Sequence, residues 1–391
     1  MSVQVSLKRL LGMGAALVLF LPLAAACGND SSSASGSSSA KAPADVGGDW
    51  ADKIATSFVG EVPTTGPAPA KNKSVWWMGC GNAVPDCKTL SDAGGEAAKL
   101  LGWDFHVADG KVNQGGGYAA AVRTALAAKP DALVIQGMDC SVIQQPLQEA
   151  KDQGVPVFGL QSLDCSEIDP SQPSLIPVKM QYHKDAETVQ DYYEAIGKNA
   201  AAYLIGANDG KANVIANLGK GGFYEYMNKG FRDEMATCAK CEILKEVRWA
   251  DADTAPNGPW IQAFTVALAK NPNANGVFIP FDSLMIGSGG KQAIKDSGLD
   301  LWLVGGAGNQ AELLQSVRDG EKVALTNAQS FRQLSFGAMD NLNRYFAGEK
   351  QVPEGIGPTL IDAKHNLPAK GKFFDGSTDW LAGYKKLWGV S

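Results

Sequence analysis

The sequence predicts an α/β protein made of two doubly wound, parallel-sheet lobes. From residue 74 onward, short apolar runs alternate with amphipathic stretches, which is typical of repeated strand–helix units. Several of the short runs are apolar throughout, such as Ala132-Leu133-Val134-Ile135, as expected for strands covered by helices on both faces. About ten strands are predicted, which is more than one such sheet usually holds, so we expect two sheets and therefore two lobes.

The order of the elements follows from this alternation. Strands are expected at 74–78, 103–107, 132–136, 155–159, 175–181, 212–217, 243–248, 276–280, 301–305 and 323–327. Helices are expected at 90–101, 118–128, 142–153, 186–205, 223–236, 259–269, 284–296, 310–318 and 334–346.

The N-terminus has the pattern of a secretory signal. Lys8 and Arg9 precede an apolar run at 10–23, and three alanines then lead directly to Cys27. The run is too short to span a bilayer, because a membrane helix needs about 20 apolar residues. A Cys directly after the small residues favours a lipoprotein signal peptide over 1–27, with Cys27 lipidated, over a plain secretory signal.

A Ser- and Pro-rich segment follows, and we expect it to be a flexible tether at 28–73. The remaining residues are enough for two lobes of ordinary size. The formal net charge of −6 gives no electrostatic reason to expect nucleic acid as a partner. We expect contact with the membrane through the lipid anchor only, at the outer face of the cytoplasmic membrane.

Six cysteines remain after Cys27, an even number in a chain expected to reach an oxidising compartment. Sequence order suggests the pairs Cys80–Cys87, Cys140–Cys165 and Cys238–Cys241, although six cysteines allow about fifteen connectivities. A zinc site is the alternative, but one C-x-x-C with three His in the chain is weak evidence for it. A redox role is also weakly indicated, because the C-x-x-C closes a helical segment instead of opening one. We expect no metal and no cofactor.

Signatures of catalysis are nearly absent. The sequence has no phosphate-binding G-x-x-x-x-G-K-[ST] loop and no G-x-S-x-G nucleophile elbow. Gly219-Lys220-Gly221-Gly222 resembles a phosphate-cradling turn, but a tight strand–helix turn explains it better. We therefore do not expect an enzyme.

Candidate ligand-binding residues follow from the rule that ligands of open α/β sheets lie beyond the carboxyl ends of the strands. These ends are rich in glycine, amides and short polar groups, which let backbone approach a ligand and supply uncharged hydrogen bonds. Aromatic side chains near strand ends and helix starts could stack on a ring. The candidates are Asn82, Asp139, Gln161, Ser162, Tyr226, Trp260, Phe281, Asp282, Asn309 and Gln329.

The acidic and aromatic residues at these positions also have a structural explanation. Asp139, Asp164 and Asp282 precede helices, where Asp commonly caps the first turn, and capping is favoured over ligand contact for any one of them. Core packing explains most of the aromatic residues, with Trp260 and Phe281 evenly balanced between core and ligand contact.

Residues 74–367 resemble the type I periplasmic solute-binding proteins, in particular the ribose and galactose branch. Four stretches carry the resemblance: 130–139 and 154–159 look like the third and fourth strands with their turns, and 275–282 and 303–308 look like two strands of the second lobe. Their order and spacing are more specific than any one of them.

The resemblance implies two lobes joined by three hinge crossovers, expected near Gln181, Gln329 and Pro358. Lobe 1 would then hold 74–181 and 329–358, and lobe 2 would hold 182–328 and 359–391 with the C-terminal tail. It also implies that a monomer closes on a small-molecule ligand and delivers it to the permease subunits of an ABC importer.

The expected site departs from the sugar-binding pattern of this family. Gln161 and Ser162 stand where sugar binders usually carry an Asp-Arg pair, and Met227 replaces an Arg before Gly230-Phe231. Phe281 replaces an Asn, and Ala307 replaces an Asp, whereas the amide Gln329 agrees with the pattern. The charged groups that would grip several hydroxyls are therefore missing.

Two kinds of ligand remain open: a sugar held by amides and aromatic faces, or a less polar cyclic or aromatic compound, which is slightly favoured. A receptor that reports to a membrane signalling protein is the alternative function. An enzyme is the second alternative, disfavoured because no nucleophile–base pair stands out.

Overall fold

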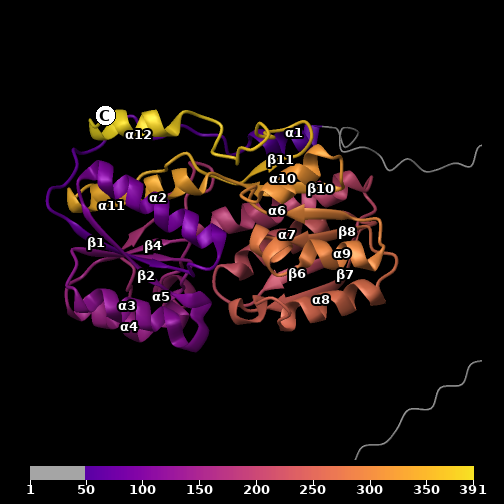
Figure 1. Cartoon of the computed structure of the whole chain (residues 1–391), viewed down its shortest axis with the longest axis horizontal. Helices are drawn as coiled ribbons and strands as arrows, with labels where there is room; N and C mark the ends of the chain where they lie inside the picture. Colours follow the sequence, from indigo (N-terminus) through magenta and orange to yellow (C-terminus); the bar gives the residue numbers. More distant parts are fainter. Residues whose placement is uncertain (1–48) are drawn as a thin grey trace, which may run out of the picture. The chain divides into compact units, whose positions relative to one another are not determined.

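The computed structural model describes residues 49–391. The predicted signal peptide (1–27), the lipidation site Cys27 and the first part of the tether (28–48) lie outside the described residues. The described part contains two parallel-dominated sheets, each covered by helices on both faces, as the sequence predicts (Figure 1).

The first lobe is built on a five-stranded sheet with the order β2-β1-β3-β4-β5, in which neighbouring strands are parallel. Strands β3 and β4 are fully buried, which explains their largely apolar sequences. The strands are β1 (Ser74–Gly79), β2 (Asp104–Asp109), β3 (Ala132–Gln136), β4 (Val157–Leu160) and β5 (Val178–Lys179).

Helices cover both faces of this sheet because alternate side chains point to opposite sides. Trp77 packs in one core with α2 and α11, whereas Met78 packs in another with α3 and α4. The helices of this lobe are α2 (Pro85–Leu101), α3 (Gly117–Ala127), α4 (Cys140–Asp152), α5 (Cys165–Ile168) and α11 (Phe331–Phe346), with a short 3-10 segment at Lys111–Gly116.

The second lobe is built on a six-stranded sheet with the order β11-β10-β9-β8-β6-β7. Its strands are parallel except β11, which pairs antiparallel with β10 at the edge. The strands are β6 (Asn213–Gly219), β7 (Glu242–Trp249), β8 (Gly276–Ile279), β9 (Trp302–Gly305), β10 (Val323–Ala328) and β11 (Thr359–Ile361).

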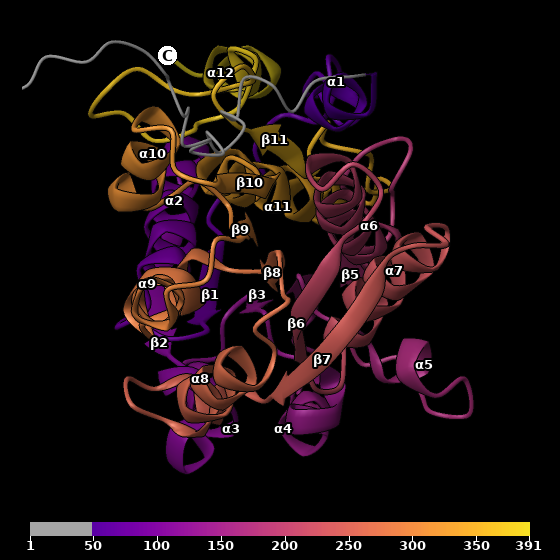
Figure 2. The same cartoon turned by 90° about the vertical axis from the view of Figure 1, so that its right-hand side faces the viewer.

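The helices of the second lobe again lie on both sides of the sheet. Figure 2 shows α6 and α7 on one side of β6 and β8, and α8 and α9 on the other. The helices are α6 (Val189–Ala207), α7 (Tyr224–Ala236), α8 (Pro259–Lys270), α9 (Gly290–Ser297) and α10 (Ala311–Arg318), with a 3-10 turn at Asp251–Thr254.

Between β1 and β11 the chain passes from one lobe to the other three times: from β5 to α6, from β10 to α11, and from α11 to β11. Because of these crossings, each lobe is built from segments that are not consecutive in sequence. The carboxyl ends of the parallel strands of both sheets face the space between the two lobes.

The prediction of a tether at 28–73 is wrong for residues 49–73, which pack on the two lobes. Helix α1 (Asp49–Thr56) places the Trp50 ring 5.2 Å from that of Tyr203, and Ala55 O accepts a hydrogen bond from Thr359 Oγ1 at 2.7 Å. Further along, Ala70 N donates to Asn343 Oδ1 at 2.9 Å. These contacts require both lobes to be folded, so local composition did not reveal them.

The C-terminal helix α12 (Trp380–Trp388) corrects the assignment of 359–391 to lobe 2, because it packs on α11 of lobe 1. Trp388 Nε1 donates to Asp340 Oδ1 at 2.7 Å, and Tyr384 OH donates to Glu354 Oε2 at 2.7 Å. The Trp388 ring also stacks on Phe336 with 5.7 Å between centroids. Strand β11, by contrast, does join the second sheet.

The helix expected at 284–296 is two elements. A π-helical turn spans Ser283–Gly287, and α9 begins at Gly290. Gly289 between them has φ +87°, a backbone conformation that breaks a right-handed helix and that glycine adopts without strain.

The structure pairs the six described cysteines as Cys80–Cys87, Cys140–Cys165 and Cys238–Cys241, with Cα–Cα distances of 5.5, 5.0 and 5.3 Å. This is the pairing suggested by sequence order. Cys140–Cys165 joins the starts of α4 and α5, and Cys238–Cys241 lies in the connection between α7 and β7.

The contacts of α12 predict a large effect of Trp388→Ala. The substitution removes a buried indole, its stack on Phe336 and its bond to Asp340, and we expect it to lower the free energy of unfolding by about 3–5 kcal/mol. Lys386→Ala, on the exposed side of the same helix, is the control and should change it by less than about 0.5 kcal/mol. Denaturant unfolding of both variants measures the difference, and equal effects would contradict the packing described.

Candidate functional site

The candidate site is a cavity of about 550 Å³ between the two lobes. Its lining comes from the carboxyl ends of strands in both sheets, from the first turns of the helices that follow, and from the connection after β10. A cavity of this size suits a small organic ligand.

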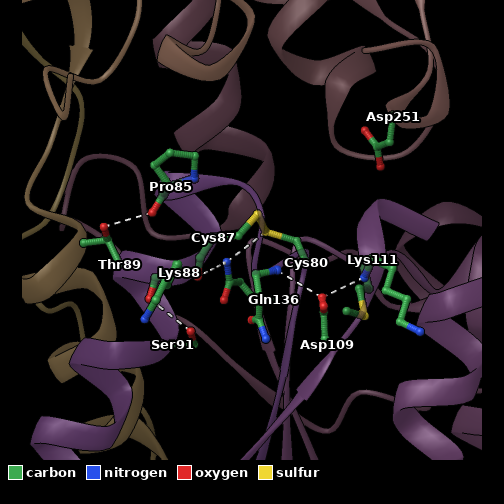
Figure 3. The surroundings of a disulfide bond; sticks show 12 residues. Cys80, Pro85, Cys87, Lys88, Thr89, Ser91, Asp109, Lys111, Gln136 and Asp251 are labelled. Carbon is green, nitrogen blue, oxygen red and sulfur yellow. Dashed lines mark hydrogen bonds between the residues drawn. A yellow bond between two sulfur atoms is a disulfide. The ribbon is translucent and has the colours of Figure 1, made fainter. Parts of the chain in front are cut away.

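The lobe 1 side of the cavity is built around the Cys80–Cys87 disulfide, and both cysteines line the cavity. Gln136, at the end of β3, is hydrogen-bonded to this disulfide loop. Its Nε2 donates to Cys80 Sγ at 2.9 Å and to Cys87 O at 3.3 Å (Figure 3). The Gln136 Oε1 accepts from Trp77 Nε1 at 2.7 Å. The Gln136 amide is therefore hydrogen-bonded within the protein, and it attaches the disulfide loop to the end of the sheet.

The lobe 2 side is an aromatic wall formed by Tyr193, Phe223, Tyr224, Trp249 and Phe281, all of which line the cavity. Neighbouring rings contact one another: Tyr193 stacks on Phe223 with 4.4 Å between centroids, and Tyr224 meets Trp249 edge-on at 4.8 Å. A continuous set of rings offers a flat apolar surface to a ligand.

Asp251 links the aromatic wall to lobe 1. Tyr224 OH donates to Asp251 Oδ1 at 2.7 Å, and Tyr118 OH, from α3 of lobe 1, donates to Asp251 Oδ2 at 3.4 Å. Burial raises the pKa of Asp251, and the two tyrosine hydrogen bonds oppose that shift. One hydrogen bond of this group thus spans the gap between the lobes.

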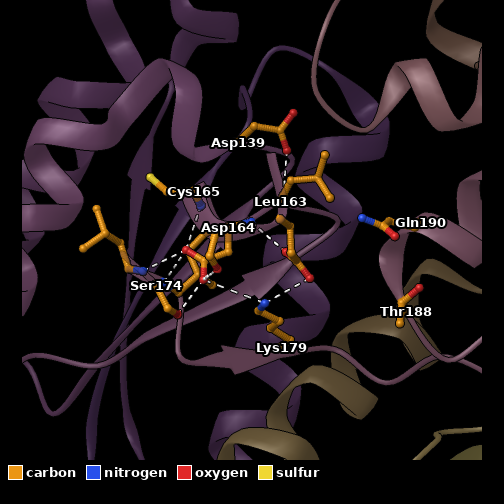
Figure 4. A network of polar contacts seen from close by, with 12 residues as sticks. Asp139, Leu163, Asp164, Cys165, Ser174, Lys179, Thr188 and Gln190 are labelled. Atoms are coloured by element: carbon orange, nitrogen blue, oxygen red, sulfur yellow. Dashed lines mark hydrogen bonds and ion pairs between the residues drawn. The ribbon is translucent and has the colours of Figure 1, made fainter. Parts of the chain in front are cut away.

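Asp139 makes a second contact between the lobes. Its Oδ1 accepts from Leu163 N at 2.7 Å within lobe 1 (Figure 4), and its Oδ2 accepts from Phe223 N at 3.1 Å in lobe 2. Burial raises the pKa of Asp139 to about 7, against the opposing effect of these two bonds. The N-terminus of α7 therefore receives a carboxylate of the other lobe, and the glycine turn before it serves this contact instead of a phosphate.

Gly222 makes this approach possible. A Cβ at this position would lie 1.5 Å from Asp139 Oδ2, and the residue has φ +53°. A side chain at 222 would therefore collide with the Asp139 carboxyl group, and the bond from Phe223 N to this group would be lost unless the lobes moved apart.

Asp86 and Asp282 bring two further carboxyl groups to the region. Asp86, on α2, lines the cavity and is 9 % exposed. Burial, followed by the charge of Asp282, raises the pKa of Asp86 to about 8. Asp282 is fully buried behind the cavity, where its two oxygens accept backbone hydrogen bonds from Ala307, Asn309 and Gln310.

The structure brings three of the ten predicted ligand-binding residues to the cavity: Gln161, Phe281 and Gln329. Gln329 sits at the connection between the lobes, where its Oε1 accepts from Tyr192 OH and its Nε2 donates to Asn327 Oδ1 at 3.1 Å. Gln161 has φ +54° and its backbone N donates to Tyr182 OH at 3.0 Å.

The other seven predicted residues do not line the cavity, and most of them have polar partners within the protein. Trp260 Nε1 donates to Asn217 Oδ1 in the core of lobe 2, and Ser162 Oγ accepts from Met138 N. Asp139 and Asp282 bind backbone amides as described above, and Tyr226 OH accepts from Gln190. The remaining two are Asn82, which is exposed, and Asn309, whose backbone N donates to Asp282.

Capping, weighed for three aspartates, explains only one of them. Asp164 forms a capping box with Glu167 at α5, and it also accepts from the backbone of Leu175 and Ile176 (Figure 4). Asp139 makes no side-chain cap, although it stands at the N-cap of α4, and Asp282 likewise caps nothing.

Several residues that line the cavity are not among the predicted ligand-binding residues, chiefly Asp86, Tyr118, Phe223, Tyr224, Trp249 and Asp251. A signal for three of them existed: Phe223 and Tyr224 follow a glycine turn after β6, and Trp249 ends β7, so all three stand at carboxyl ends of strands. Asp86 lies next to Cys87, whose pairing with Cys80 holds it at the end of β1.

The lining of the cavity contains no Lys, Arg or His, according to the described residues that form it. Across residues 49–391 no group of three or more His, Cys, Asp or Glu side chains is arranged to hold a metal ion. Over the same range, none of the helices combines the length and apolar character that crossing a bilayer demands.

The comparisons agree with this geometry. The family model described as periplasmic binding protein domain matches residues 82–350, more than half of the chain. No curated protein sequence matches the chain.

Similar solved structures include an ABC transporter solute binding protein from Agrobacterium vitis with bound allitol. It is 20 % identical, with a TM-score of 0.59, covering 75 % of this chain and 96 % of that one. A glucose-galactose binding protein from Geobacillus stearothermophilus is 17 % identical, with a TM-score of 0.61 and coverage of 76 % and 100 %. A solute binding protein from Mycobacterium smegmatis with bound glycerol is 18 % identical, with a TM-score of 0.60 and coverage of 78 % and 100 %.

At these identities the structural likeness establishes the fold, which is the type I arrangement of two α/β lobes. The matched family consists of binding proteins and not of enzymes. This chain therefore belongs to the periplasmic binding protein family and has its type I fold.

Proposed function

We propose that this protein is a lipid-anchored solute receptor outside the cell, which captures a small organic molecule between its lobes and delivers it to an ABC importer. The observation that carries the proposal is the cavity of about 550 Å³ between lobes that are linked across it by hydrogen bonds. A ligand enclosed from both sides favours the closed form, because it contacts both lobes only there.

The delivery step rests on the family. Solved relatives are described as ABC transporter solute binding proteins, which supports an importer as the partner. A role in signalling to a membrane protein would use the same closing motion. Neighbouring permease and ATPase genes would favour transport, and a neighbouring sensor gene would favour signalling.

The lipid anchor rests on the sequence around Cys27 and on the short apolar run before it. Intact mass of the mature protein from its host tests it: a chain that begins at Cys27 and carries acyl groups supports the anchor. A mature chain that begins elsewhere, or that lacks the acyl mass, would contradict it.

The ligand is proposed to be less hydroxylated than a plain aldose. The aromatic wall supports this, as does the absence of Arg and Lys from the lining, because sugar sites often grip hydroxyls with paired charges. Solved relatives with bound allitol and D-allose support the alternative, a sugar held by amides and ring faces.

A thermal-shift series separates these two ligands. We expect common free pentoses and hexoses to leave the melting temperature unchanged, whereas a true ligand at about 100 times its dissociation constant should add about 2.7 kcal/mol. Native mass spectrometry of protein from its own host should reveal a retained small molecule. Stabilisation by a plain aldose at micromolar concentration would instead support a sugar as the ligand.

Closure can be tested at Gly222. We expect Gly222→Ala to leave each lobe folded but to hold the lobes apart, because its Cβ would collide with Asp139. Gly221→Ala is the matched control: it also has positive φ, +75°, but its Cβ meets nothing within 4 Å. Small-angle scattering of protein with its retained small molecule should show a larger radius of gyration for Gly222→Ala alone. Compaction of this variant equal to that of the wild type would refute closure through this contact.

The Cys80–Cys87 disulfide is expected to matter for binding. Replacing both cysteines with serine frees the loop that carries Asp86, so affinity for the retained molecule should fall about tenfold, or about 1.4 kcal/mol. The matched control replaces Cys238 and Cys241, which lie outside the cavity lining. Calorimetric titration compares the two double variants, and similar affinities would show that the loop needs no covalent support.

A further inference from the structure

We infer that the ligand carries a positively charged nitrogen, which binds at Asp86 against the aromatic wall. The inference rests on the proposed function, since it names the class of molecule that the cavity takes. It goes beyond the proposal of a less hydroxylated ligand, because it predicts that the ligand carries a positive charge.

The first observation is an unused acceptor. Asp86 is 9 % exposed and lines the cavity, and its Oδ1 has no hydrogen-bond partner in the described chain. A buried carboxyl oxygen without a partner costs free energy, so a donor is expected to fill the place when the site is occupied.

The second observation is the charge around that oxygen. Asp282 lies near Asp86 and Asp251 faces the same cavity, whereas no Lys, Arg or His contributes to its lining. Burial and the charge of Asp282 raise the pKa of Asp86 to about 8, although hydrogen bonds from the Gln310 side chain and the Ser283 backbone oppose that shift. An anionic ligand would add repulsion here, and a cationic one would supply the missing counter-charge.

The third observation is the composition of the facing wall. The rings of Tyr224, Trp249 and Phe281 line the cavity, and an ammonium group is attracted to such ring faces when water is excluded. The hydroxyl groups of Tyr118 and Tyr224 donate to Asp251, so their oxygens are left to accept from a ligand.

One donor in the wall also lacks a partner. Trp249 Nε1 is buried without an acceptor, so the ligand should offer a neutral oxygen as well as a cationic nitrogen. These requirements together describe an amino alcohol or an amino sugar, with enough apolar surface to cover the rings.

Matched pairs of probes test the charge. D-glucosamine, choline and benzylamine are compared at pH 7 with D-glucose, 3,3-dimethylbutan-1-ol and benzyl alcohol, which keep each skeleton and lose the charged nitrogen. We expect at least one cationic member to bind about tenfold or more tightly than its neutral partner, measured by calorimetry.

The role of Asp86 is tested with Asp86→Asn, which keeps the shape and removes the charge. It should abolish the preference for the cationic probe while leaving the unliganded protein folded. Asp92→Asn is the control, because Asp92 is exposed on the same helix and pairs with Lys88 outside the cavity. The preference of Asp92→Asn for the cationic probe over its neutral partner should equal that of the wild type.

The outcomes separate this inference from the proposed function. If the cationic probes bind as tightly to Asp86→Asn as to the wild type, or if the molecule retained from the host is neutral, the cationic ligand is refuted and the solute receptor stands. If all the cationic probes fail to bind and the retained molecule is neutral or anionic, the inference also fails. If neither probe nor host molecule binds at all, the proposed function itself is refuted.

Discussion

Of the two hydrogen bonds described between the lobes, the buried one runs from Phe223 N to Asp139 Oδ2, and the closed arrangement of this protein depends most on it. The carboxyl group belongs to lobe 1 and is almost fully buried, so it would need water or another donor if the lobes separated. The donor is the amide of the N-cap residue of α7 in lobe 2, and backbone N–H groups at the start of a helix are unpaired and favour an anion. The residue that donates also begins the aromatic wall, so the contact that closes the lobes and the surface that meets the ligand share one backbone segment.

Most of the fold could be predicted because its central strands, such as β3, β4, β8 and β9, are buried on both faces. Continuous apolar runs such as Ala132-Leu133-Val134-Ile135 can be recognised as buried strands, and all ten predicted strands occur. Strand β11 was missed because it has three residues and pairs only at an edge. Helix α12 and the segment at 49–73 were placed wrongly because their contacts, such as Trp388 with Asp340, join residues far apart in sequence.

The site was predicted less well than the fold, for a physical reason. Strand topology determines which edge of a sheet faces the cavity, and Gln161, Phe281 and Gln329, which were chosen in this way, line that cavity. It does not determine whether a polar side chain at that edge points to the cavity or is used by the protein. The oxygens of Asp282, for example, are occupied by the backbone amides of the loop after β9.

The acids around the cavity differ in how they are satisfied, and this difference carries the argument about the ligand. Asp139 binds backbone amides of both lobes, Asp251 binds two tyrosine hydroxyl groups, and Asp282 binds backbone amides. Asp86 keeps an oxygen without a partner, and it stands beside the Cys87 that the disulfide fixes. Asp86 lines the cavity next to the cysteine that the disulfide fixes, so its carboxyl group can meet a ligand donor there. The covalent loop, the buried acid and the ring faces are therefore consistent as parts of one site for a donor-rich ligand.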